Sequence, residues 1–303
     1  MNTNQCPKIS EVLVGFTEYM SAERRFSPRT VKNYGEACRY FAKELGDLGV
    51  SEIELRHFIS LKARMEVRGT GASRVASIIV GMKCLLQYVR DVLGVAVMDL
   101  TGIRTPKAPS REVTYLTHDE LGIFFAAIRL QTWTGEPRYS GYCFRALAET
   151  LLATGMRISE ALALDRNSID LVAKEAVIVG KGNKQRTVFF TDRALEWLQK
   201  YLALRRDSNP ALFLSSRSRR LTIDAVGRTF CRVRTWAGLE KHVTPHTLRH
   251  TTATNLLANG CPIGFIREVL GHQRLETTCR YYLGILNRAD TKKAHEKYSC
   301  LAA

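Results

Sequence analysis

The chain has 303 residues, 45 of them Lys or Arg and 29 Asp or Glu, so its formal net charge is +16. With 45% hydrophobic and 24% charged residues it can bury a core, which excludes global disorder, and its length favours two domains. No run of about 18 apolar residues occurs, as a membrane span needs, and the first residues lack the basic and apolar regions of a signal peptide, so we expect neither. The eight cysteines never form Cys-x-x-Cys, which predicts reduced thiols in a cytoplasmic protein rather than a zinc cluster or disulfide framework.

The positive charge is unevenly distributed along the chain. Residues 1–105 carry a net +4 and residues 106–303 a net +12. Such an excess is typical of a protein that binds a polyanion, most often nucleic acid, because each neutralised phosphate releases counterions. A merely soluble basic protein would have the same composition, so charge favours nucleic acid only as a class.

The first hundred residues predict a bundle of four helices. Ser10 can cap the first helix, Ser27-Pro28 begins the second, and the capping-box pattern at 51–54 begins a third with Phe58 and Ile59 facing inward. The fourth helix carries apolar residues at helical spacing: Val75, Ile78, Ile79, Met82, Leu85, Leu86, Val89 and Leu93. These helices predict one small all-α domain.

Residues 101–113 interrupt this periodicity with two prolines, a glycine and three basic residues, which predicts an extended linker. The capping box Thr117–Glu120 then begins a helix. Residues 176–179 and 185–190 have the pattern of strands, joined by a hairpin turn at 180–184. Helices dominate the remainder, so we expect a mainly α fold with a small β-sheet (α+β).

The first two polar motifs lie near predicted turns. Gly155 ends one helix and Arg157 begins the next, so Glu160 can orient the Arg157 guanidinium. A lone Arg/Glu pair is, however, usually an ordinary surface ion pair. Lys181 lies in the hairpin turn, where a lysine is commonly solvated, although a stiff hairpin could carry it into a groove as a proton donor.

A third polar motif begins a helix. Thr244 caps it and Pro245 is its first residue, so His246 and Arg249 share one face near its positive end, which suits an anion. His246 and His250 have the spacing of a zinc-binding pair. The glutamate of that motif is absent and Arg249 would repel a dication, so we expect no metal here.

A fourth polar motif follows an apolar run. Gly271 reads as a helix stop that leaves His272 just beyond the helix, and Tyr281-Tyr282 follow. A tyrosine pair is more often packing than chemistry. Together, however, the four motifs supply two Arg, one Lys, two His and a Tyr. This set could bind a phosphodiester and attack it without a metal.

These motifs resemble those of the tyrosine recombinases of the phage integrase/Xer family, and the resemblance covers essentially the whole chain. Arg157-Ile-Ser-Glu160 is similar to the family's first-arginine motif, and Lys181 lies where the family has its hairpin lysine. His246-Thr-Leu-Arg249 is similar to its His-x-x-Arg box.

The fourth motif completes the resemblance. Leu-Gly-His272 is similar to the family's third polar box, and Tyr281 follows His272 at the family's nine-residue spacing, so register favours Tyr281 over Tyr282. The resemblance implies a C-shaped clamp on DNA with three regions: a helical core-binding domain at 1–100, the linker at 101–113, and a catalytic domain with a C-terminal exchange helix at 114–303.

The resemblance also implies a mechanism without cofactor or metal. Tyr281 attacks the scissile phosphate to give a 3′-phosphotyrosine, which keeps the phosphodiester energy for rejoining. The other site residues would assist: Arg157 and Arg249 clamp the phosphate, Lys181 protonates the leaving 5′-oxygen, His246 assists proton removal, His272 hydrogen-bonds the phosphate and Glu160 is structural support.

The partner implied is double-stranded DNA with a specific inverted-repeat core site. Recombination would pass through a Holliday junction in a homotetramer on synapsed DNA, with possible accessory proteins and no membrane, and would serve integration, excision or resolution. The protein would be cytoplasmic and nucleoid-associated, encoded by a bacterium, phage or mobile element. The basic candidates for DNA contact are Arg29, Lys32, Lys107, Arg111, Lys184, Arg217, Arg219 and Arg220.

Two alternatives remain. A type IB topoisomerase uses a similar catalytic set but acts as a monomer; the helical N-terminal domain and the spacing from His272 to Tyr281 favour the recombinase. A catalytically silent, recombinase-derived DNA-binding protein would lack at least one catalytic residue, and none is missing here.

Overall fold

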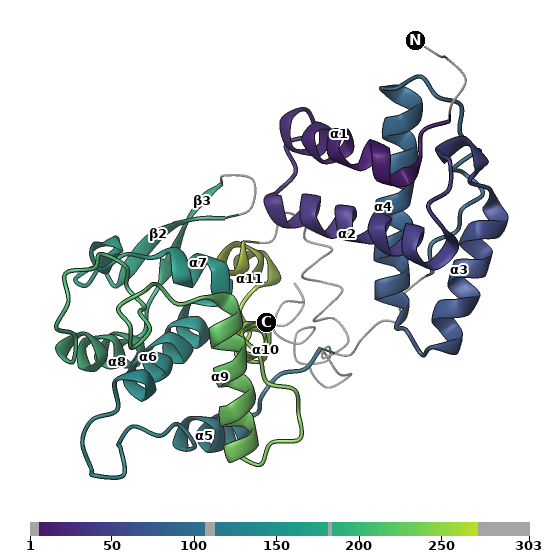
Figure 1. The fold of residues 1–303 in the computed structure, drawn as a ribbon. Helices are drawn as coiled ribbons and strands as arrows, with labels where there is room; N and C mark the ends of the chain where they lie inside the picture. The colour runs from purple at the N-terminus through teal and green to yellow at the C-terminus, as the bar shows by residue number, and fades with distance from the viewer. Residues whose placement is uncertain (1–5, 107–112, 181–183, 272–303) are drawn as a thin grey trace, which may run out of the picture. The chain divides into compact units, whose positions relative to one another are not determined.

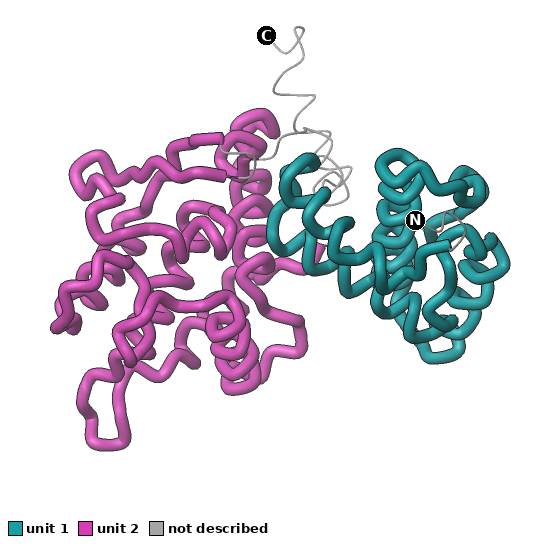
Figure 2. The backbone as a smooth tube through the Cα atoms, turned by 45° about the horizontal axis from the view of Figure 1, so that its top comes forward, with its two compact units in different colours: residues 1–111 teal, residues 112–303 magenta. Residues whose placement is uncertain are grey.

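The computed structural model describes residues 6–106, 113–180 and 184–271 (Figure 1). The chain divides into two compact units, residues 1–111 and 112–303, coloured separately in Figure 2. Each unit has its own hydrophobic core. The fold class predicted from the sequence is confirmed, because the described residues are mostly helical with one three-stranded antiparallel sheet.

Unit 1 contains the four predicted helices and a short 3-10 turn at Val50–Glu52. The helices are α1 (Ile9–Ala22), α2 (Pro28–Leu45), α3 (Leu55–Val67) and α4 (Ala72–Asp91). Ser27 accepts a hydrogen bond from the Thr30 amide, so the predicted cap of α2 is confirmed. In the core, α2 packs on both α1 and α4.

α4 contributes more buried residues to this core than any other helix of unit 1. Of the helices in the described part of the chain, it alone is long and apolar enough to cross a membrane, and 50% of its most apolar window is buried. The buried side chains lie at helical spacing and pack against the other helices of the unit. They identify α4 as the core helix of unit 1.

Four local predictions for unit 1 are wrong, the first being the end of the fourth helix, because Leu93 lies beyond its last residue, Asp91, and is exposed. Lys8, rather than Ser10, is the N-cap of α1, and the Ser10 hydroxyl donates instead to the Asp47 carboxylate. Residues 50–52 form the 3-10 turn, so α3 begins only after Glu54. Ile59 is 57% exposed, because the buried stripe of α3 runs through Phe58, Leu61 and Met65 and one step along a helix turns a side chain away.

Unit 2 surrounds a long buried helix, α6 (Tyr139–Thr154), which packs on α8 and α10. The other helices are α5 (His118–Ala126), α7 (Ile158–Ala163), α8 (Asp192–Ala203), α9 (Ile223–Trp236), α10 (Pro245–Ala258) and α11 (Ile263–Leu270). The predicted capping box is confirmed at α5, where Thr117 accepts from the Glu120 amide and Glu120 accepts from the Thr117 amide.

The small sheet has the order β1 (Ile169–Asp170), β2 (Glu175–Val179) and β3 (Gln185–Phe189). The two predicted strands pair with Val179 opposite Gln185, and the Gly180 amide donates to the Lys184 carbonyl at 2.8 Å, which closes the hairpin. Ala176, Ile178 and Val188 are buried on the inner face. β1 was not predicted, because two residues carry no periodic signal.

A buried ion cluster joins α6 to α8. Glu149 accepts from Arg145 and from Arg193, each at 2.9 Å, and is 3% exposed. The Arg145 guanidinium lies 4.5 Å from the centre of the Trp197 ring and 4.2 Å from that of Phe125. One buried carboxylate is thus neutralised by two arginines, an arrangement that recurs at the site below.

Candidate active site

The described residues of the site meet where α6 and α11 end. Gly155 ends α6 with φ of 61°, a left-handed conformation that glycine adopts without strain, and the chain then turns so that Arg157 is the N-cap of α7. A Cβ atom on Gly155 would lie 3.1 Å from Leu270 Cδ2, so glycine also lets α11 approach. Gly271 ends α11 in the same left-handed conformation, with φ of 63°. The predicted helix stops at both glycines are confirmed.

Arg249 is held by the carbonyl ends of two helices. It is 4% exposed and donates from Nη1 to the Gly155 carbonyl at 2.6 Å and from Nη2 to the Leu270 carbonyl at 2.5 Å. Helix C-termini carry partial negative charge, which stabilises a guanidinium. Arg249 therefore ties the ends of α6 and α11 together.

Arg157 reaches the same end of α11. Its Nη1 donates to Glu160 Oε1 at 2.9 Å, its backbone amide donates to Glu160 Oε2 at 2.7 Å, and its Nη2 is 3.4 Å from the Gly271 carbonyl. The Arg157 side chain is 31% exposed. Arg249 thus contacts Leu270 and Arg157 contacts Gly271, the two residues that directly precede His272 in the chain.

Glu160 is bound by a second arginine that no sequence motif predicts. Arg186, on β3, donates from Nη1 to Glu160 Oε1 at 3.0 Å and from Nη2 to Oε2 at 2.9 Å. Burial pushes the pKa of Glu160 upward, but hydrogen bonds from Arg186 and Arg157 outweigh it and lower that pKa, so the carboxyl is charged. The sequence does contain one indication of this contact: Arg186 is a cation on the same face of the strand as the buried residue Val188.

α10 presents two histidines beside these arginines. Thr244 accepts from the Thr247 amide at 3.2 Å, so the predicted cap is confirmed. Burial, Arg249 and Arg157 lower the pKa of His246, which keeps its imidazole neutral at neutral pH. Burial and the neighbouring His246 and Arg249 lower the pKa of His250 to about 4.

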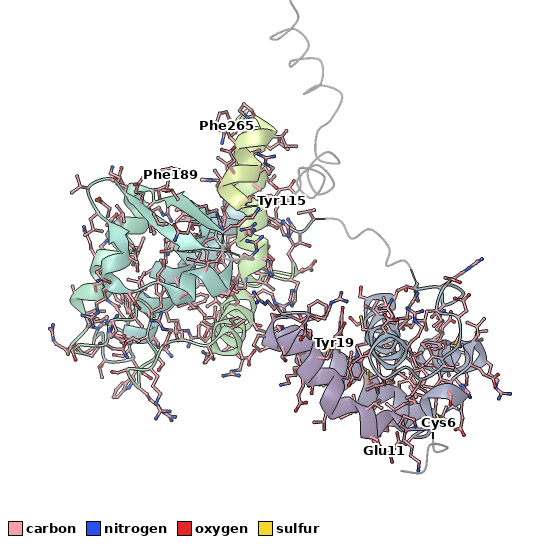
Figure 3. The ribbon with its side chains drawn as sticks, turned by 90° about the horizontal axis from the view of Figure 1, so that it is seen from above. Cys6, Glu11, Tyr19, Tyr115, Phe189 and Phe265 are labelled. Carbon is pink, nitrogen blue, oxygen red and sulfur yellow. The ribbon has the colours of Figure 1, made fainter. Side chains whose placement is uncertain are left out.

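A pocket of about 630 Å³ opens between the β2–β3 hairpin and α11. Its lining includes four basic side chains and one acidic one: Arg157, Lys184, Arg186, Arg267 and Glu268. Two aromatic side chains that Figure 3 labels, Phe189 on β3 and Phe265 on α11, also line it and are 59% and 62% exposed. The surplus of positive charge suits an anionic group.

The remaining candidates fall into two groups. Several lie outside the described residues: Lys107, Arg111, Lys181, His272, Tyr281 and Tyr282. The others are exposed: Arg29, Lys32, Lys184, Arg217, Arg219 and Arg220. Arg220 differs from the rest, because it donates to the Leu162 and Leu164 carbonyls and pairs with Asp165, so its guanidinium holds loops of unit 2 together.

Comparison with known proteins identifies the class. The phage integrase family profile matches residues 115–286, more than half of the chain. The chain therefore belongs to the phage integrase family. It is similar to the tyrosine recombinase XerC of Proteus mirabilis, with 30% identity over 280 residues that cover 90% of this chain and 89% of that protein. XerC of Chlamydia pneumoniae is 28% identical over 295 residues, covering 89% of this chain and 93% of that protein.

Comparison with solved structures supports the same family. XerA recombinase is 28% identical with a TM-score of 0.52, covering 95% of this chain and 98% of that chain. XerH recombinase bound to palindromic difH has a TM-score of 0.69 at 23% identity, covering 96% and 84%, and so shows the fold alone. The chain is thus a tyrosine recombinase, an enzyme that cuts and rejoins DNA in site-specific recombination. The topoisomerase and silent-binder alternatives are not favoured.

Proposed function

We propose that Tyr281 is the nucleophile of this recombinase and that Arg157 and Arg249 hold the phosphate it attacks. The supporting observation is that these two arginines, far apart in the sequence, both reach the last turn of α11, directly before His272. His246 lies close enough for both guanidiniums to lower its pKa. Two guanidiniums and a neutral imidazole are groups that a phosphoryl transfer needs.

The proposed reaction is a transesterification. The bond from Tyr281 Oη to phosphorus forms and the bond from phosphorus to the 5′-oxygen breaks, which leaves a 3′-phosphotyrosine. The phenolic proton leaves with help from neutral His246, and Lys181 donates a proton to the 5′-oxygen. Arg157 and Arg249 stabilise the charge on the non-bridging oxygens, and His272 hydrogen-bonds the same phosphate.

The proposed DNA substrate is a core site with inverted repeats, such as the palindromic difH site in the XerH complex. Four copies of the chain would bind two synapsed sites and exchange strands through a Holliday junction, with the free 5′-hydroxyl of a partner strand attacking the phosphotyrosine. Integration, excision or resolution would result, with accessory proteins setting direction. We propose that the protein acts in the cytoplasm in association with the nucleoid and is encoded by a bacterium, a phage or a mobile element.

A suicide substrate tests the nucleophile. A nicked core site loses its 5′-hydroxyl fragment after cleavage, so the covalent protein–DNA adduct cannot be rejoined and accumulates. Its amount is quantified on a denaturing gel. We expect Tyr281→Phe to form no adduct and the adjacent Tyr282→Phe to form it at the wild-type rate. An adduct in Tyr281→Phe would overturn the proposal.

The same assay tests the phosphate-binding role of Arg157. Removing one preorganised donor to a transition-state oxyanion typically slows a reaction by about 100- to 1,000-fold. We expect Arg157→Ala to lose cleavage to this extent while binding the site with wild-type affinity in a gel-shift titration. Loss of binding at an unchanged cleavage rate would reduce Arg157 to an affinity contact.

A further inference from the structure

Arg186 contacts the elements that carry the site residues without being one of them. Its side chain leaves β3 towards the N-terminus of α7 and is 14% exposed. A Cβ atom on Gly271 would lie 2.8 Å from Arg186 Cζ, so the guanidinium packs directly against the backbone that precedes His272. Arg186 also follows Lys181 by five residues.

The Glu160 carboxylate is saturated with donors. Oε1 accepts from Arg157 Nη1 and Arg186 Nη1, and Oε2 accepts from the Arg157 amide and Arg186 Nη2. An ionised carboxylate has about four lone-pair sites in all. Arg157 therefore contributes one guanidinium nitrogen to Glu160, while Arg186 contributes two.

This unequal sharing of the Glu160 oxygens between the two arginines determines how much positive charge Arg157 presents to the pocket. Arg157, Arg186 and Glu160 together carry one net positive charge. Without Arg186, the buried carboxylate would have only Arg157 as a cationic partner, and an arginine and a carboxylate readily form a closed bidentate pair. Arg157 would then be neutralised and its donors would turn from the pocket towards Glu160.

We propose that Arg186 is a positioning residue: by binding both oxygens of Glu160, it leaves the remaining Arg157 donors and their positive charge to the scissile phosphate. The inference rests on the proposed function, in which Arg157 binds that phosphate. It implies that Glu160, supportive in the wild type, becomes inhibitory once Arg186 is removed. A merely structural role has no such consequence.

Single-turnover cleavage of the suicide substrate tests this reversal. Arg186→Gln should cleave about 10- to 100-fold more slowly than wild type, the usual cost of misorienting a catalytic group. Glu160→Gln added to Arg186→Gln removes the competing charge and should raise the rate at least about 5-fold above Arg186→Gln alone, because residues in one ion-pair network couple. Site affinity should stay at the wild-type value in both variants.

The cluster at Glu149 supplies a matched control, since it too places two arginines on one buried glutamate. Arg145→Gln should lower the melting temperature without slowing cleavage measured below that temperature. Adding Glu149→Gln should not change the cleavage rate. If the cleavage rate rises only when Glu160→Gln is added to Arg186→Gln, the increase reports on the reacting phosphate and not on the stability of the fold.

The outcomes are distinct. A double variant as slow as Arg186→Gln, or slower, would overturn the positioning role. Wild-type cleavage by Arg157→Ala would instead overturn the proposed function, whatever Arg186→Gln does.

Should Arg186→Gln not fold, Arg186→Lys keeps a cation beside Glu160 but offers one nitrogen instead of two. It should cleave at an intermediate rate, and Glu160→Gln should again accelerate it; no acceleration would overturn the proposal.

Discussion

Gly271 links the end of α11 to the Arg186 side chain. Its φ of 63° is strained for any residue with a Cβ atom, and that atom would lie 2.8 Å from Arg186 Cζ. We expect Gly271→Ala to destabilise the protein by about 1 kcal/mol or more and to slow cleavage, because either α11 or Arg186 must shift. Thermal unfolding and single-turnover cleavage measure the two effects.

The same helix offers a control glycine. Gly264 lies in the first turn of α11, and a Cβ atom there would meet nothing within 4 Å. Gly264→Ala should therefore leave cleavage unchanged and keep or slightly raise the melting temperature, because alanine favours a helix. Equal cleavage rates for the two alanine variants would contradict the role given to Gly271.

The helix α10 carries a pH-dependent part of the stability. The folded protein holds the pKa of His250 at about 4, against an ordinary value of 6.5. As pH falls from about 6.5 to about 4, His250 is protonated in the unfolded chain but stays neutral in the folded chain. The folded state therefore loses stability across this pH window, and above it His250 has no effect on stability. We expect His250→Gln to flatten the fall of the melting temperature between these pH values. An unchanged slope would refute the assignment.

The elements that the sequence predicted correctly have local signals. Thr244-Pro245 begins α10, Gly155 ends α6, and the strand-like runs at 176–179 and 185–190 with the turn composition between them predict the hairpin, each from residues close together in the chain. The pairing of Arg186 with Glu160 spans 26 residues and depends on how β3 packs beside α7. No local pattern encodes such a contact, so the sequence predicted Glu160 but not its second partner.

For the whole molecule, the +16 charge predicts that DNA affinity falls steeply with salt. Each phosphate neutralised contributes about 0.9 to the slope of log affinity against log salt concentration. Replacing both exposed Arg217 and Arg219 with alanine should reduce that slope by about 1.8 if each contacts one phosphate, without changing the melting temperature. Titrations at several salt concentrations measure this slope.

Arg220→Ala is the contrasting variant. Its guanidinium is bonded to two backbone carbonyls and pairs with Asp165, so its removal should lower the melting temperature instead. A slope unchanged by the Arg217 and Arg219 substitutions would show that these side chains do not contact phosphate.

The two separate cores have a spectroscopic consequence. All three tryptophans, Trp133, Trp197 and Trp236, belong to unit 2, whereas helices fill both units. Tryptophan fluorescence therefore follows the unfolding of unit 2 alone, and far-ultraviolet circular dichroism follows both units. Recording both signals on one denaturant titration separates the free energies of unfolding of the two units within the intact chain.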